Sequence, residues 1–149
     1  MKKYVIDDLD NWDTVLNTLE ELKNKKLLDS HQDELIRLIR YNDNWRLREA
    51  ALQAACHVRK PTRDLIDEVM NIVVREDVGI DARIFAVEAA ESMIENAFSL
   101  KKPEKRDIQA IAAQTVQRLR YLRSCPQVPI FTSALNKALG RINDLLKTA

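Results

Sequence analysis

The sequence predicts an all-α chain, and three observations support this fold class. The 149 residues include only 2 Gly and 4 Pro, too little turn chemistry for the many short strands of a β-sandwich or barrel. Apolar residues recur at helical spacing along most of the chain. A mass of 17.2 kDa is about that of one ordinary domain, so we expect residues 1–149 to share one core.

Four helices are expected in the first half of the chain. Their apolar residues recur at i, i+3, i+4 and i+7, which is the pattern of a helix with one buried face. Ser30 is the expected N-cap of the second helix, and Pro61 separates the third from the fourth. The expected segments are about 11–23, Ser30 to Ile39, 44–58, and Thr62 to Val73.

Three more helices are expected in the second half. The fifth follows Gly79 and carries apolar residues to about Ala97. The sixth begins near Pro103, because proline suits the first turn of a helix, and it ends before Cys125. The seventh, about 128–147, is the most hydrophobic segment of the chain.

The chain repeats itself. Asp10-Asn11-Trp12 recurs as Asp43-Asn44-Trp45, a shift of 33 residues, and a further shift of 35 residues aligns Ile80 with Trp45. A period of this length with two helices in each unit is typical of a stacked α-solenoid. We therefore expect about three helical hairpins and a C-terminal capping helix. Their expected bounds are about 10–41, 43–76 and 77–123 for the hairpins and 128–147 for the cap.

The self-alignment predicts equivalent positions in successive units. Leu19, Leu52 and Val87 are expected to be buried at equivalent places. Arg48 and Arg83 are expected near the starts of their helices. Each should bond an acidic or carbonyl group of a neighbouring hairpin, because the planar guanidinium can bridge two acceptors.

Two segments, Asp43 to Leu52 and Asp77 to Val87, open with Asp, carry an Arg a few positions later and continue into an Ala-rich stretch. In this they resemble HEAT-like repeat proteins, and the resemblance covers residues 43–97. It implies a short right-handed superhelix that presents one curved face to another protein. By analogy with small stand-alone proteins of this fold, we expect an adaptor or a toxin-neutralising immunity protein.

One segment near the N-terminus resembles part of an enzyme family. The run Trp12-Asp13-Thr14-Val15-Leu16 is similar to the Trp-Asp-Thr-Val-Asp run of HEAT-like DNA glycosylases. Leu16 stands where those enzymes have the carboxylate that would stabilise positive charge on the sugar, so we expect no enzymatic activity. Trp12 and Trp45 are then expected to be packing anchors of the hairpins, with base stacking as the alternative.

No cofactor or metal is expected. The sequence has no Gly-rich nucleotide-binding loop, no Gly-x-Ser-x-Gly hydrolase motif and no His-Glu-x-x-His zinc-protease motif. Cys56 and His57 are adjacent and point about 100° apart on a helix, so they cannot chelate one ion alone. No run of 18 apolar residues and no signal-like N-terminus is found, so we expect a cytoplasmic protein with no membrane partner.

The charge distribution suggests two kinds of partner. Residues 1–97 carry 14 basic and 20 acidic residues, a balance of −6, and residues 98–149 carry 10 and 3, a balance of +7. We expect another protein to bind the exposed ridge of the second helices, and nucleic acid to be the alternative partner of the basic last third. The ridge comprises Glu34, Arg37, Arg40, Asp64, Asp67 and Glu68. The residues of the nucleic-acid alternative are Arg118, Arg120 and Arg123.

Overall fold

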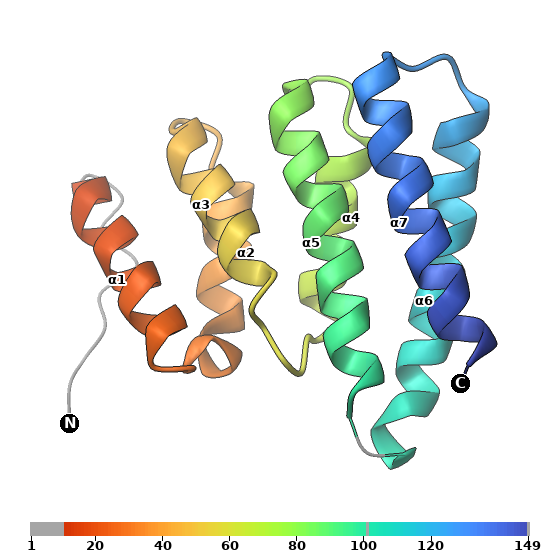
Figure 1. Cartoon of the computed structure of the whole chain (residues 1–149). Coiled ribbons are helices and arrows are strands. Elements are labelled where there is room, and N and C mark those ends of the chain that lie inside the picture. The colour runs from red at the N-terminus through yellow and green to blue at the C-terminus, as the bar shows by residue number, and fades with distance from the viewer. Residues whose placement is uncertain (1–10, 101, 149) are drawn as a thin grey trace.

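The computed structural model describes residues 11–100 and 102–148, and within them the side chains of all residues except 102–106. These residues form seven α-helices, one short 3-10 helix and no strand, which confirms the all-α prediction. None of the described helices combines the length and the apolar character that crossing a bilayer requires. In chain order (Figure 1) the helices are α1 (Trp12–Asn24), η2 (Leu28–His31), α2 (Gln32–Arg40), α3 (Trp45–Ala55), α4 (Arg63–Val74), α5 (Ile80–Phe98), α6 (Lys102–Ser124) and α7 (Pro129–Lys147).

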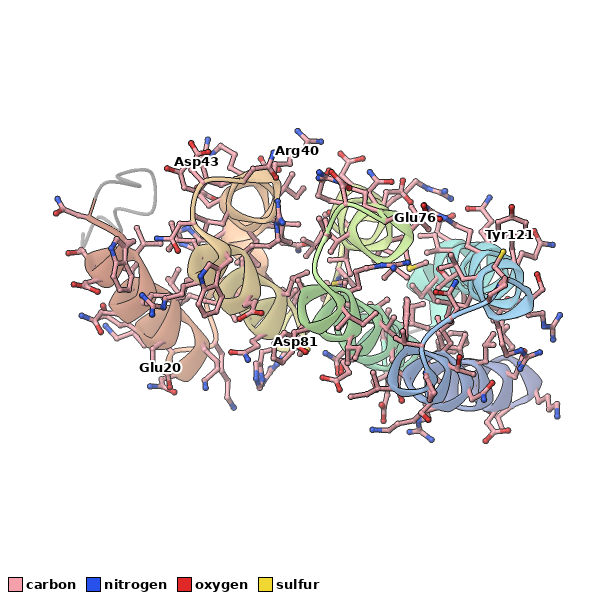
Figure 2. The ribbon with its side chains drawn as sticks, turned by 90° about the horizontal axis from the view of Figure 1, so that it is seen from above. Glu20, Arg40, Asp43, Glu76, Asp81 and Tyr121 are labelled. Carbon is pink, nitrogen blue, oxygen red and sulfur yellow. The ribbon has the colours of Figure 1, made fainter. Side chains whose placement is uncertain are left out.

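The α-helices lie in two layers (Figures 1 and 2). One, which we call the odd layer, contains α1, α3, α5 and α7, each packed on the next and all starting at the same edge of the molecule. The even layer contains α2, α4 and α6, which run in the opposite direction. Between the layers α2 packs on α3, α4 on α5 and α6 on α7. The buried apolar side chains of both layers form one cluster that runs the length of the array.

The predicted register of the core is confirmed. Leu19, Leu52 and Val87 have 4%, 0% and 1% of their surface exposed, and they lie on α1, α3 and α5. Because these three helices are neighbours in the odd layer and all three side chains belong to one core cluster, successive units bury the same position.

Two arginines join the layers at equivalent positions. Arg48 is the fourth residue of α3, and its Nε donates to the carbonyl of Ile39 in the last turn of α2 at 3.1 Å. Arg83 is the fourth residue of α5, and its Nε donates to the carbonyl of Val73 in the last turn of α4 at 2.9 Å. The predicted equivalence and the predicted carbonyl acceptors are confirmed.

Ser30 is not the N-cap of α2 that the sequence predicts. It lies in η2, where its hydroxyl donates to the carbonyl of Leu27 at 3.0 Å. Helix α2 starts at Gln32, whose buried amide donates to the carbonyl of Lys60 at 3.0 Å and accepts from the backbone N–H of Thr62 at 2.8 Å. These partners lie 28 and 30 residues further along the chain, so a contact between distant segments fixes the start of α2.

Helix α3 is shorter than predicted. It ends at Ala55, whereas the apolar pattern extends to Val58. The side-chain amide of Asn96, on α5, donates to the carbonyls of Cys56 and Val58 at 3.0 and 2.9 Å. Because α5 supplies partners for these carbonyls, the chain turns into the next loop without leaving them unsatisfied.

Candidate functional site: a groove between two helices of the even layer

A groove with a volume of about 380 Å³ lies between α2 and α4. Five of the six residues predicted for the protein-binding ridge line it, and only Glu34 does not. Its floor includes Ile36, which is buried, and its walls are polar. The lining residues are Asp33, Ile36, Arg37, Arg40, Asp64, Asp67, Glu68 and Asn71.

Helical spacing explains why these side chains share one groove. Positions 33, 37 and 40 follow i, i+4, i+7 on α2, and positions 64, 67, 68 and 71 follow i, i+3, i+4, i+7 on α4. Each set therefore lies on one side of its helix. Since α2 packs on α4 within the even layer, the two sets become the opposite walls of the groove.

Glu68 holds Arg40 in place. Its Oε2 lies 2.8 Å from Nε of Arg40, and the residue is only 8% exposed, although the sequence placed it on an exposed ridge. The expectation of exposure is wrong because Arg40 reaches from α2 and covers the carboxylate. The Arg40 side chain itself is 66% exposed, so its guanidinium is both fixed and accessible. An arginine held in this way loses little freedom when it binds a partner.

Glu34 lies apart from the groove. Its carboxylate is half-buried and lies 3.8 Å from Nδ1 of His31, one turn earlier in the chain. Position 34 is about 100° around the α2 axis from position 33, so this side chain leaves the groove wall. The predicted ridge therefore divides into five residues that line the groove and one that does not.

Opposite charges face each other across the groove. The wall formed by α2 carries Arg37 and Arg40, and the wall formed by α4 carries Asp64 and Asp67. Asp33 adds a third exposed carboxylate, from the start of α2. Within the described part of the chain no hydrogen bond or ion pair engages these three aspartates. Such fixed charges of both signs can orient a partner whose charges are complementary.

The three arginines of the nucleic-acid alternative are spread around α6. Arg120 and Arg123 are exposed, whereas Arg118 is half-buried and lies about 160° around the helix axis from Arg120. Nη1 of Arg123 also donates to Oδ1 of Asn136 on α7 at 3.3 Å. The structure therefore does not bring these three guanidinium groups together on one face.

The two tryptophans differ from their predicted role. Trp12 is half-buried and packs against the core, but Trp45 is 62% exposed and is therefore not a packing anchor. The guanidinium carbon of Arg46 lies 5.4 Å from the ring centre of Trp12 and 5.1 Å from that of Trp45. Sequence reasoning missed Arg46. The sequence does contain a pattern that indicates a role for Arg46: Trp45 and Arg46 open α3, and Trp12 opens the neighbouring α1.

Among the residues that the structure describes, no group of three or more His, Cys, Asp or Glu side chains is placed to hold a metal ion. Cys56 is half-buried between helices, and burial raises the pKa of its thiol, so this thiol is a poor nucleophile.

Comparisons with protein-family models, curated proteins and solved structures find no match to this chain. The function is therefore inferred from the geometry and the charges of the α2–α4 groove.

Proposed function

We propose that the chain is a non-enzymatic protein-binding module, of the adaptor or immunity-protein kind, that holds a protein partner in the α2–α4 groove. One observation carries the proposal: Arg37 and Arg40 on one wall face Asp64 and Asp67 on the other across about 380 Å³. Charges of both signs on opposite walls match a protein segment, which also carries both, and they set its register in the groove.

The fold that we propose for this module is a short α-solenoid of HEAT-like hairpins. The equivalent bonds from Arg48 and Arg83 to the ends of the preceding even-layer helices support it, because they recur with the sequence repeat. In stacked hairpins one set of helices lines the side that binds a partner. The even layer, with its groove, is the layer that we assign to this role.

The charges of the groove favour a protein over a nucleic acid. Its lining includes four carboxylates and two arginines, so a phosphate backbone laid in it would meet repulsion along most of its length. A protein segment with a cationic residue near Asp64 and an acidic residue near Arg40 would meet attraction at both places.

Photo-crosslinking from inside the groove tests where the partner binds. A photoreactive amino acid replaces Asn71, which lines the groove, and in the control it replaces the exposed Ser133 on α7. We expect position 71 to crosslink to one defined protein in native cells and position 133 to give no such product. The reverse pattern would place the partner on the other layer.

Binding kinetics with that purified partner then test the role of charge. Asp64→Lys combined with Asp67→Lys is expected to slow association at least about tenfold at low salt, with a smaller effect at high salt. Glu68 is left unchanged because its buried carboxylate holds Arg40. The control is Glu88→Lys with Asp144→Lys, which makes the same charge change at exposed positions outside the groove.

Equal association rates for the Asp64/Asp67 variant and the wild type at low salt would contradict the proposal. Crosslinking to nucleic acid, together with loss of binding after neutralising Arg118, Arg120 and Arg123, would instead support the nucleic-acid alternative.

A further inference from the structure

The edge at which the odd-layer helices begin carries an exposed tryptophan. Trp45 opens α3 and is 62% exposed, and Trp12 opens the neighbouring α1. Figure 2 looks onto this edge, with Asp43 and Asp81 labelled on either side of the start of α3. Tryptophan is one of the residues that contribute most at binding surfaces.

The chain itself shows that these indoles accept a cation. The guanidinium of Arg46 lies within 5.4 Å of both ring centres, inside the distance of about 6 Å at which a cation is attracted to an aromatic ring. Trp12, Arg46 and Trp45 therefore form one stack across α1 and α3. Since Trp45 stays 62% exposed in this stack, most of its indole remains open to a further group.

Two carboxylates that influence each other lie on α3 and α5, one of them a helical turn after Trp45. Glu49 follows Trp45 by four residues, so it lies one turn along the same face of α3, and Asp81 lies in the first turn of α5, which packs on α3. Burial raises the pKa of the Glu49 carboxyl, and the nearby charge of Asp81 raises it further. Within the described residues neither carboxylate has a hydrogen bond or an ion pair.

We infer that this edge is a second binding site, which takes an arginine side chain from a basic segment of a protein. The incoming guanidinium stacks on the exposed part of Trp45, and Glu49 and Asp81 supply the charge that balances it. Arginine fits better than lysine because its planar group stacks on an aromatic ring while its N–H groups bond carboxylates. The site belongs to the odd layer and does not depend on the α2–α4 groove.

Fluorescence gives a direct test, because the chain has only 2 tryptophans and both belong to this stack. The probe is a peptide in which arginine alternates with alanine, acetylated and amidated at its ends, and the matched control peptide has citrulline in place of arginine. Citrulline keeps the planar shape and removes the charge. We expect a saturable change in tryptophan emission with the arginine peptide, and binding at least about tenfold weaker with the citrulline peptide.

Variants assign the binding to these residues, with affinity measured by anisotropy of a dye-labelled arginine peptide. Trp45→Ala is expected to weaken binding at least about fivefold, and Trp45→Phe should weaken it less because the ring is kept. Glu49→Gln with Asp81→Asn should also weaken it. The control, Glu88→Gln with Asp144→Asn, removes two carboxylates elsewhere and should change affinity less than about twofold.

Thermal unfolding of each variant, followed by circular dichroism, confirms that it is folded before its affinity is compared. Three results would overturn the inference: no saturable change in the wild type, unchanged affinity in Trp45→Ala, or equal losses in the two carboxylate variants. The last of these would mean that the peptide responds to net charge and not to this site.

Discussion

The guanidinium of Arg83 lies over the ring of Phe131, with its carbon 4.4 Å from the ring centre. The same side chain donates to the carbonyl of Val73, so it joins α4, α5 and α7. Arg48, at the equivalent place on α3, donates to Ile39 but stays half-exposed. Burial lowers the pKa of both arginines, and only Arg83 is nearly enclosed, at 7% exposure.

The two arginines should therefore differ in their contribution to stability. We expect Arg83→Lys to lower the free energy of unfolding by about 1–3 kcal/mol, because lysine loses the planar contact with Phe131 and cannot keep the same bond to the Val73 carbonyl. Arg48→Lys should cost less, since its surroundings are wetter. Urea unfolding measures both, and an equal loss for the two variants would contradict this difference.

Leu52 tests the register of the repeat. Truncation to alanine should lower the free energy of unfolding by about 2–4 kcal/mol, because Leu52 is fully buried and the change leaves a cavity. The matched control is Val128→Ala at a position that is 52% exposed, where we expect a loss below about 0.5 kcal/mol. Urea unfolding measures the loss in both variants. Similar losses of unfolding free energy would mean that Leu52 does not lie in the shared core.

Substitution of Asp29 tests its contact with the loop that follows α3. Its carboxylate oxygens accept from the backbone N–H groups of Arg59 and Lys60 at 2.8 and 2.9 Å. We expect Asp29→Ala to lower the free energy of unfolding by about 1–3 kcal/mol, because two backbone donors lose a charged acceptor. The exposed Asp144→Ala is the control. Unchanged stability would show that the bonds do not hold the loop.

Glu91 gives a prediction about pH. Burial raises the pKa of its carboxyl. Lys137 opposes this rise, and the charge of Glu95 adds to it. A carboxyl whose pKa is higher in the folded than in the unfolded chain makes stability fall as the pH rises between the two values. Above the folded-state pKa, Glu91 is charged where the fold disfavours charge.

Glu91→Gln should therefore raise the free energy of unfolding at a pH above the folded-state pKa, by no more than about 0.5 kcal/mol because solvent screens this partly exposed group. The gain should vanish at a pH below both pKa values, where the wild-type carboxyl is protonated. Urea unfolding at the two pH values measures it, with Asp107→Asn, at an exposed position of α6, as the control. A gain of equal size under both conditions would show that charge is not its cause.

Periodicity predicted the features that depend on one helix at a time. The buried positions of Leu19, Leu52 and Val87 and the sharing of one groove by residues of two helices follow from helical spacing and the repeat. The burial of Glu68 does not follow from spacing, because it depends on an arginine that arrives from another helix. The exposure of Trp45 was missed because the repeat treats equivalent positions as alike.

Hydrogen exchange in the presence of the purified partner tests most directly whether the α2–α4 groove is the binding site. The account predicts that the partner slows amide exchange in Gln32–Arg40 and Arg63–Val74 and leaves exchange in Lys102–Ser124 and Pro129–Lys147 unchanged. Protection confined to the last two helices, with none in the first two, would contradict it.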